Sequence, residues 1–363
     1  MRIGVPKEIK VHEYRVGLAP ASVQELVALG HEVVVESGAG EGIGFTDAMY
    51  RKAGGEVADV DSAFAADLVV KVKEPQLHEC ARLQAGQVLF TYLHLAADRP
   101  QAEALMASGV TAIAYETVVG RSGGLPLLMP MSEVAGRMSI QVGAWCLQRA
   151  NGGRGTLLGG VPGVQPGKVV ILGGGISGSN AASMAVGMQA DVTILEKSVD
   201  RMRALVDHFE GRARVLMASE DNVEQSVLQA DLVVGAVLIP GAAAPKLVSR
   251  DLVRRMPNGS AMVDISIDQG GCFETSRPTN HDEPIYMDEG VVHYCVTNMP
   301  GAVARTSTMA LNNVTLPYVK ALAELGWRVA LAEDEGFAQG LNVHEGHLHH
   351  ASVAEALRLP LAA

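Results

Sequence analysis

The stretch KVVILGGGISGSNAASMAVGMQADVTILE, residues 168–196, decides the fold of this chain. An all-aliphatic run opens it, and Gly173, Gly175 and Gly178 then satisfy the pattern GxGxxG. In such a pattern the first glycine permits a tight turn, the second lets a phosphate approach the backbone, and the third lets a helix pack closely on the preceding strand. The stretch therefore predicts a β-strand, a dinucleotide-binding loop and a helix of small residues, in that order.

An acid closes this stretch, because Glu196 lies 18 residues after Gly178, at the end of the second aliphatic run. An acid at this place accepts hydrogen bonds from the adenosine ribose hydroxyls and repels a 2′-phosphate, which favours NAD(H) over NADP(H). The helix expected from Ile176 and Ser177 onward offers its first N–H groups to the phosphates. A glycine pattern alone could be a turn without function, but the strand, the helix and the acid around it favour a nucleotide site.

Length and composition set the frame around this site. A chain of 363 residues suits two domains, and 48% hydrophobic against 19% charged residues supplies full hydrophobic cores. The net charge of −11 argues against a nucleic-acid surface, and the N-terminal MRIGVPKEIK has no apolar signal core. Residues 169–190 carry no charge, but five glycines there predict strand, loop and helix instead of a membrane span. Four scattered cysteines favour reduced thiols in a cytoplasmic protein.

Short apolar runs alternate with helical stretches in the first third of the chain. Such alternation is typical of a parallel, doubly wound sheet. We expect strands there at residues 2–5, 32–36, 68–72, 88–92 and 111–115, and helices at residues 21–29, 47–53 and 101–107.

A second series of strands and helices follows a long helical stretch at residues 131–150, for which Ser132 is a plausible N-cap. Six strands make two mononucleotide-binding halves. We expect these strands at residues 169–172, 192–195, 214–217, 232–236, 261–265 and 292–296.

The helix expected at residues 307–325 returns to the first domain, because the remaining chain is too short for a third core. The predicted fold class is therefore α/β with two doubly wound domains. One is a Rossmann NAD-binding domain at residues 128–304. The other is a discontinuous substrate domain with a parallel sheet at residues 1–127, completed by a return segment at residues 305–363.

Three polar residues of the first domain follow its expected strands, and ligands of open parallel sheets bind at the carboxyl ends of strands. Arg15 comes after the first strand, Lys73 just after residues 68–72, and His94 just after residues 88–92. Arginine binds a carboxylate bidentately, lysine can hold a carboxylate or polarise a carbonyl, and histidine can shuttle a proton near neutral pH. Each alone could be a solvated or structural side chain, but their shared rim predicts a site for a small oxo- or amino acid.

The second domain offers Asp268, which lies just past the strand expected at residues 261–265. Two glycines after it let the backbone approach a ligand closely. Asp264, within the strand, is expected to be structural. The late histidines look like a metal cluster, but we expect solvated side chains and no metal site at His344, His347, His349 and His350.

A series of ordered stretches now resembles the alanine dehydrogenase family along nearly the whole chain. The matching stretches are PKEIKVHEYRVGLAPASV, VESGAGEGIGF, VKVKEP, LFTYLHLAAD, MSEVAGRMS, GGGISGSNAA, GAVLIPGAAAPKLV, MVDISIDQGGCFE and VTNMPGAVARTSTMALNN. The same superfamily includes the NAD-binding subunit of proton-translocating transhydrogenase. The resemblance implies an NAD-dependent enzyme that interconverts L-alanine with pyruvate and ammonia, working as a cytosolic homohexamer.

The resemblance also implies a role for each matched residue. Arg15 and Lys73 would bind the substrate, with Arg15 on its carboxylate. His94 would be the acid/base, and Asp268 would assist proton transfer at the amine or the attacking water. Cofactor contacts are implied for the glycine loop and for Ser132, Ile176, Ser177, Glu196, Arg201, Val237, Leu238, Ile265, Arg277, Asn298 and Met299.

The chain departs from the family pattern at two places. The family usually has Asp where this chain has Glu196, which lengthens the arm by one methylene and keeps the charge. A serine that contacts adenine in relatives aligns with Ala218. Two alternatives stay open: a non-catalytic NAD-sensing scaffold, and a transhydrogenase-type NAD-binding module. The latter lacks the His of LHLAAD and the Asp of DISIDQGG.

Overall fold

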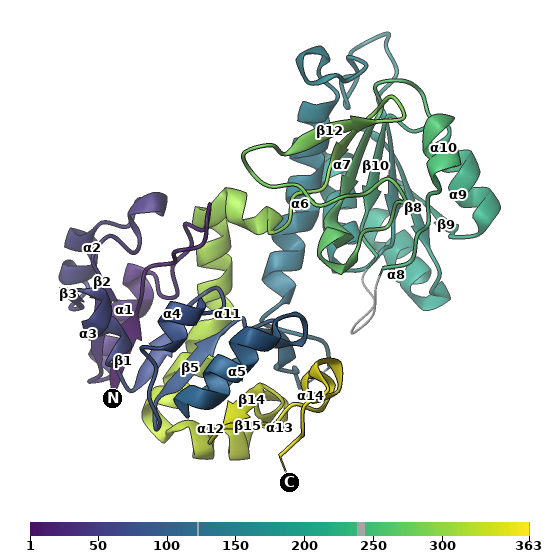
Figure 1. Cartoon of the computed structure of the whole chain (residues 1–363). Helices are drawn as coiled ribbons and strands as arrows, with labels where there is room; N and C mark the ends of the chain where they lie inside the picture. Colours follow the sequence, from purple (N-terminus) through teal and green to yellow (C-terminus); the bar gives the residue numbers. More distant parts are fainter. Residues whose placement is uncertain (122, 238–243, 363) are drawn as a thin grey trace. The chain divides into compact units, whose positions relative to one another are not determined.

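The chain folds into two compact units in the computed structural model, which describes residues 1–121, 123–237 and 244–362. The first unit comprises Met1–Met131 and Val303–Ala363, so both ends of the chain build it. The second unit comprises Ser132–Ala302. In Figure 1 the purple, blue and yellow segments belong to the first unit, and most teal and green segments belong to the second.

An eight-stranded sheet carries the first unit, in the order β15-β14-β6-β5-β4-β1-β2-β3. The six strands from β6 to β3 are parallel, as the alternation of strands and helices predicts. They are β1 (Arg2–Val5), β2 (Glu32–Glu36), β3 (Glu56–Ala58), β4 (Leu68–Val70), β5 (Val88–Thr91) and β6 (Thr111–Ala114).

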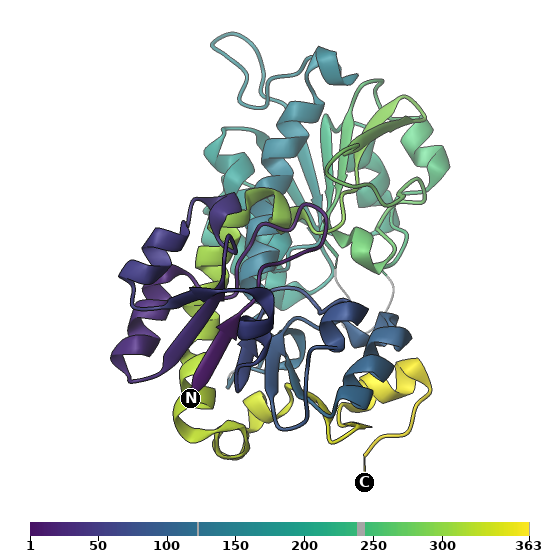
Figure 2. The same ribbon diagram turned by 60° about the vertical axis from the view of Figure 1, so that its left-hand side comes forward.

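The return segment adds two antiparallel edge strands to this sheet. β14 (Leu341–His344) pairs with β6, and β15 (His347–Leu348) pairs with β14. Figure 2 shows this yellow C-terminal segment beside the blue part of the first unit. Neither strand was expected from the sequence.

Helices cover both faces of this sheet. The longest, α11 (Ala304–Leu325), places Leu311 in the same core as Ile3 of β1. A second core on the other face contains Val69 of β4 and Leu105 of α5. Burial of apolar surface at about 25 cal/mol per Å² holds the return segment in place. The remaining helices are α1 (Pro20–Ala28), α2 (Asp47–Lys52), α3 (Val60–Phe64), α4 (Leu77–Cys80), α5 (Arg99–Ser108), α12 (Trp327–Glu333), α13 (Glu335–Ala338) and α14 (Ala351–Leu357).

The second unit has a seven-stranded sheet in the order β12-β13-β11-β10-β7-β8-β9. Counted along the chain from β7, its six parallel strands run 3-2-1-4-5-6, the order of a doubly wound nucleotide-binding fold. The predicted Rossmann fold is therefore confirmed. The strands are β7 (Lys168–Leu172), β8 (Asp191–Glu196), β9 (Arg214–Met217), β10 (Leu232–Gly235), β11 (Ala261–Asp264), β13 (Val291–Tyr294) and the antiparallel edge strand β12 (Ile285–Asp288).

The helix expected at residues 131–150 is α6 (Met129–Cys146), which begins before Ser132. The prediction of Ser132 as the N-cap is therefore wrong. Pro130 explains the earlier start, because proline suits the first turn of a helix, where its missing N–H costs no bond. The other helices of this unit are α7 (Ile176–Gly187), α8 (Val199–Phe209), α9 (Glu220–Val227) and α10 (Arg250–Arg254).

The uncharged residues 169–190 form most of β7, then the glycine loop and α7. Among the described residues, no helix is long and apolar enough to cross a membrane. All four cysteines are buried free thiols.

Candidate active site

Arg15, Lys73 and His94 follow three neighbouring strands of the first sheet. β1 pairs in parallel with β4, and β4 with β5, so the carboxyl ends of these strands meet at one edge. Glu8 and Tyr92 connect the three residues. Glu8 accepts a hydrogen bond from the backbone N–H of Lys73, and the Tyr92 ring stacks on the His94 ring. Both Glu8 and Tyr92 lie within electrostatic reach of Arg15.

The Arg15 side chain is buried and forms a two-pronged ion pair with Glu13. Nε donates to Oε1 of Glu13 at 2.7 Å, and Nη2 donates to Oε2 at 2.5 Å. Nη1 contacts the thioether sulfur of Met131 at 3.2 Å. Burial alone would lower the pKa of Arg15, but the Glu13 carboxylate outweighs burial and raises it. The guanidinium is therefore charged and held in one orientation.

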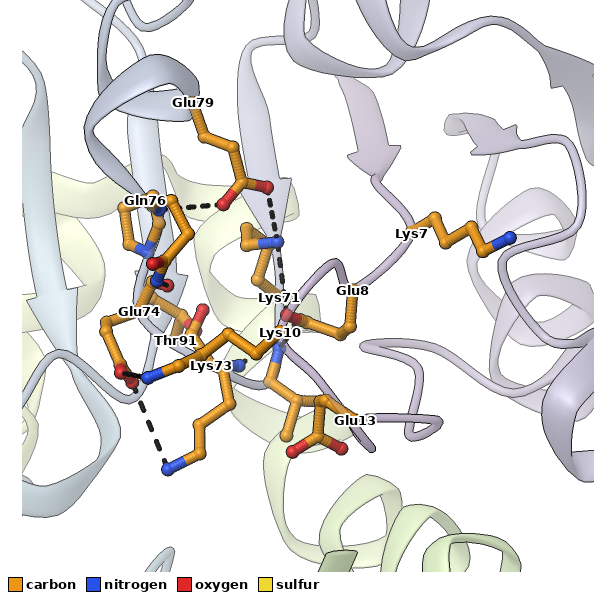
Figure 3. A network of polar contacts seen from close by, with 12 residues as sticks. Lys7, Glu8, Lys10, Glu13, Lys71, Lys73, Glu74, Gln76, Glu79 and Thr91 are labelled. Atoms are coloured by element: carbon orange, nitrogen blue, oxygen red, sulfur yellow. Dashed lines mark hydrogen bonds and ion pairs between the residues drawn. The ribbon is translucent and has the colours of Figure 1, made fainter. Parts of the chain in front are cut away.

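Lys73 lies in a network of alternating charges, which Figure 3 shows. Its side chain is 17% exposed, and its Nζ lies 4.0 Å from Oε2 of Glu74. Glu74 also forms an ion pair with Lys10. Burial opposes the ionisation of Glu74, but the two lysines prevail and lower its pKa. Lys73 is thus a charged group that reaches solvent at the sheet edge.

Two residues before it, Lys71 is fully buried. Its Nζ lies 2.9 Å from Glu79 and 3.2 Å from Glu8, and Figure 3 shows it between them. Glu8 also accepts the N–H of Val72 at 2.7 Å. Burial raises the pKa of Glu8, although Lys71 opposes the shift. This cluster fixes the segment that carries Lys73.

His94 is exposed and has a left-handed backbone, with a φ of 52°. Such a conformation is strained for a residue other than glycine and needs support from its surroundings. Glu116 gives that support, because its carboxylate accepts the N–H of His94 at 2.6 Å and the N–H of Leu93 at 3.2 Å. The Tyr92 ring stacks on the imidazole with centroids 5.7 Å apart.

The glycine loop of the second unit has the geometry that a dinucleotide requires. Gly173 has a φ of 96°, which only glycine adopts readily. A Cβ on Gly178 would lie 1.8 Å from the carbonyl oxygen of Gly173, so α7 packs directly on the loop. A Cβ on Gly175, in contrast, would meet nothing within 4 Å. The loop therefore leaves space for a phosphate beside Gly175, where Ile176 and Ser177 begin α7.

Glu196 lies at the end of β8, beside this loop. Its Oε2 accepts the N–H of Gly174 at 2.8 Å, and its Oε1 accepts the N–H groups of Lys197 and Ser198. Arg201 supports the same loop, because its Nε donates to the carbonyl oxygen of Gly174 at 2.6 Å. Both charged side chains are therefore oriented by the loop itself.

Val237 and Ile265 follow the neighbouring strands β10 and β11. A Cβ added to Gly173 would lie 2.9 Å from the Val237 side chain. Val237 therefore borders the glycine loop. Ser266, next to Ile265, donates to the carbonyl oxygen of Val237 at 2.7 Å. The structure thus brings these two residues to the carboxyl edge of the second sheet, while Leu238 lies outside the described residues.

Asp268 is an exposed residue of the 3-10 turn Ile265–Gln269. Asp264 anchors this turn, because its buried carboxylate accepts the N–H of Cys272 at 2.7 Å and the hydroxyl of Ser276 at 2.6 Å. Burial raises the pKa of Asp264 against these donors. The structural interpretation of Asp264 agrees with these contacts.

The other expected cofactor residues are spread over the second unit. Ser132 is partly buried in the first turns of α6. Asn298 has a φ of 60° and its carbonyl oxygen faces His281, while Met299 beside it is buried. Arg277 is exposed and stacks over the Tyr286 ring at 3.9 Å. The contacts described here do not link Ser132 or Arg277 to the glycine loop.

The late histidines do not form a metal site within the described part of the chain. His347 and His349 are exposed, as expected for solvated side chains. His344 differs, because it packs against Trp327 and lies 3.0 Å from the hydroxyl of Thr111.

Sequence reasoning missed the carboxylates that hold the predicted residues: Glu8, Glu13, Glu74 and Glu116. Glu13 and Glu74 have a local signal, since Glu13 lies two residues before Arg15 and Glu74 directly follows Lys73. Glu116 is 22 residues from His94, and no spacing rule connects them.

Two family models match the chain: the alanine dehydrogenase/PNT N-terminal domain at residues 4–135, and the C-terminal domain at residues 139–351. An alanine dehydrogenase of Halomonas elongata is 58% identical over 99% of this chain and 97% of its own length. A solved structure of an L-alanine dehydrogenase is 53% identical, with a TM-score of 0.96 over 99% of both chains.

A solved transhydrogenase from Sinorhizobium meliloti is less similar. It is 25% identical, with a TM-score of 0.83 over 97% of this chain and 100% of its own. Both domain models, nearly full-length coverage and the higher identity agree on one assignment. The chain belongs to the alanine dehydrogenase family.

Proposed function

We propose that the chain catalyses the reversible oxidation of L-alanine to pyruvate and ammonia, with NAD as the hydride acceptor. Membership of the alanine dehydrogenase family makes it an amino-acid dehydrogenase. One observation carries the assignment of the substrate and the cofactor to this chain. A Rossmann unit with an acid at the end of β8 occurs together with a sheet edge that holds Arg15, Lys73 and His94.

The first unit, in this proposal, binds the substrate. Arg15 holds the carboxylate of alanine or pyruvate, since a guanidinium matches a carboxylate in shape and charge. Lys73 adds a second positive charge at the same edge and stabilises the negative charge on the substrate oxygens. The ion pairs of both residues hold their side chains in place, which lowers the cost of ordering them on binding.

The reaction needs proton transfers that this chain can supply. NAD, when bound by the second unit, would supply the acceptor for the hydride that leaves Cα of alanine. Water then adds to the substrate iminium, and His94 takes its proton and returns one to the leaving amine. Asp268 assists proton transfer at the amine or at the attacking water. The carbinolamine collapses to pyruvate and ammonia.

The second unit, in this proposal, binds NAD. The glycine loop and the start of α7 hold the pyrophosphate, through Gly173, Gly175, Ile176, Ser177 and Gly178. Glu196 accepts the ribose hydroxyls and repels a 2′-phosphate, and Arg201 supports the adenosine end. The other proposed cofactor contacts are Ser132, Val237, Leu238, Ile265, Arg277, Asn298 and Met299. We place the enzyme in the cytoplasm, as a homohexamer.

One assay tests this function. NADH formation is measured with each of the twenty amino acids, and NADPH formation is measured with L-alanine. We expect turnover with L-alanine and NAD, and little with NADP. The similarity to a transhydrogenase gives the competing outcome: tight NADH binding without turnover of any amino acid would favour a nucleotide-binding module.

A further inference from the structure

Glu13 is a buried carboxylate that accepts three hydrogen bonds from Arg15. Its two oxygens accept Nε and Nη2 of Arg15, and Oε1 also accepts the backbone N–H of Arg15 at 3.1 Å. Glu13 is 5% exposed and Arg15 is 2% exposed. Such charge-assisted bonds are strong in a dry environment, where the dielectric constant is low.

The ion pair uses one particular edge of the guanidinium. A guanidinium presents donors along two edges suited to a carboxylate, and Glu13 occupies the edge formed by Nε and Nη2. Nη1 points to the sulfur of Met131, which is a weak acceptor. A carboxylate that approaches Nη1 would gain a charge-assisted hydrogen bond there, and the Glu13 pair would stay intact.

We propose that Glu13 is the positioning residue for recognition of the substrate carboxylate. It holds the Nε–Nη2 edge of Arg15, so that Nη1 binds the substrate carboxylate. The carboxylate then displaces the Met131 sulfur from Nη1. This inference rests on the proposed role of Arg15. Glu13 also neutralises Arg15, so binding selects the shape of a carboxylate and not merely any anion.

The experiment compares E13Q, R15K and the double variant E13Q/R15K in steady-state assays with pyruvate, ammonium and NADH. Glutamine cannot give two charged acceptors to Arg15, so E13Q should raise the KM for pyruvate about tenfold or more. The NADH affinity should stay near that of the parent, while the Tm should fall, because the buried guanidinium loses its charged partner. In the R15K background, where the fork is absent, E13Q should change the KM less than about threefold.

Controls separate this inference from folding and from the function proposed above. E103Q makes the same chemical change at a carboxylate that is 53% exposed, and it should leave the KM unchanged. E13D keeps the charge on a shorter arm, and its KM should lie between those of the parent and E13Q. If E13Q does not fold, E13D is compared in the parent and R15K backgrounds with the same expectation.

The results of these assays distinguish the role of Glu13 from the role of Arg15. Equal effects of E13Q with and without R15K would overturn the positioning role, as would an unchanged KM. A lower KM in E13Q would show instead that Glu13 competes with the substrate for Arg15. If R15K itself leaves the KM for pyruvate unchanged, the proposed function of Arg15 fails and not only the role of Glu13.

Discussion

The carboxylate of Glu116 accepts a hydrogen bond of 2.6 Å from the backbone N–H of His94, whose φ of 52° is unusual for a side-chain-bearing residue. Strain of this kind costs of the order of 1–3 kcal/mol and persists where the surroundings hold it. We expect E116A to lower kcat by about tenfold or more, because a small displacement of a reacting group is costly. Stopped-flow turnover checks this, with E103A as the control. Parent-like kcat in E116A would show that His94 keeps its place without Glu116.

His94 and Asp268 separate an enzyme from a nucleotide-binding module. We predict that H94A and D268A each lower turnover by about a hundredfold or more, the scale of general acid–base groups. The affinity for NADH should stay within a few-fold, as fluorescence titration would show. Alanine oxidation at the parent rate in H94A would exclude His94 as the acid/base.

Replacement of Arg15 by lysine should not be conservative. A point charge cannot reproduce the fork that binds Glu13, and it leaves that buried carboxylate poorly paired. We expect kcat/KM to fall for both pyruvate and alanine, since both carry the carboxylate, while NADH binding barely changes. Loss of NADH binding with intact pyruvate affinity would contradict the assignment.

Glu196 should set the choice of cofactor. We predict a strong preference for NAD over NADP, because like charges at this place cost on the order of one to a few kcal/mol. E196Q keeps an acceptor for the N–H of Gly174 and removes the charge, so it should narrow the ratio of kcat/KM between the cofactors. E196A should weaken both cofactors, since it also releases the loop. Equal use of NAD and NADP by the parent would refute the prediction.

Two glycines of the loop should respond to alanine in opposite ways. G178A places a Cβ 1.8 Å from the carbonyl oxygen of Gly173, so we expect a lower Tm and a loss of stability of about 1–3 kcal/mol. G175A places a Cβ where nothing lies within 4 Å, so it should keep the Tm and weaken NADH binding. Thermal melts and NADH titrations distinguish the two effects. An unchanged NADH affinity in G175A would show that the phosphate does not bind beside Gly175.

The nucleotide loop and most parallel strands could be predicted from the sequence, because their signals are local. Within a single strand–loop–helix unit, the order of aliphatic residues, glycines and a final acid follows from backbone geometry between near neighbours. The antiparallel strands β14 and β15 could not, since β14 pairs with a strand more than 200 residues earlier in the chain. The start of α6 was also predicted wrongly. The helix begins at Met129, ahead of Ser132, because Pro130 is favourable in the first turn of a helix.

Lys71 and Lys73 illustrate what required the tertiary structure. In the sequence they are alike, two lysines at the end of one strand in VKVKEP. In the fold Lys71 is fully buried between Glu8 and Glu79, and Lys73 reaches solvent beside Glu74. A buried charge needs a partner at bonding distance, and these partners come from segments that only folding brings together. Residue type and strand position therefore predicted that lysines lie at this sheet edge. Packing decided that Lys71 is buried and that Lys73 is accessible to a ligand.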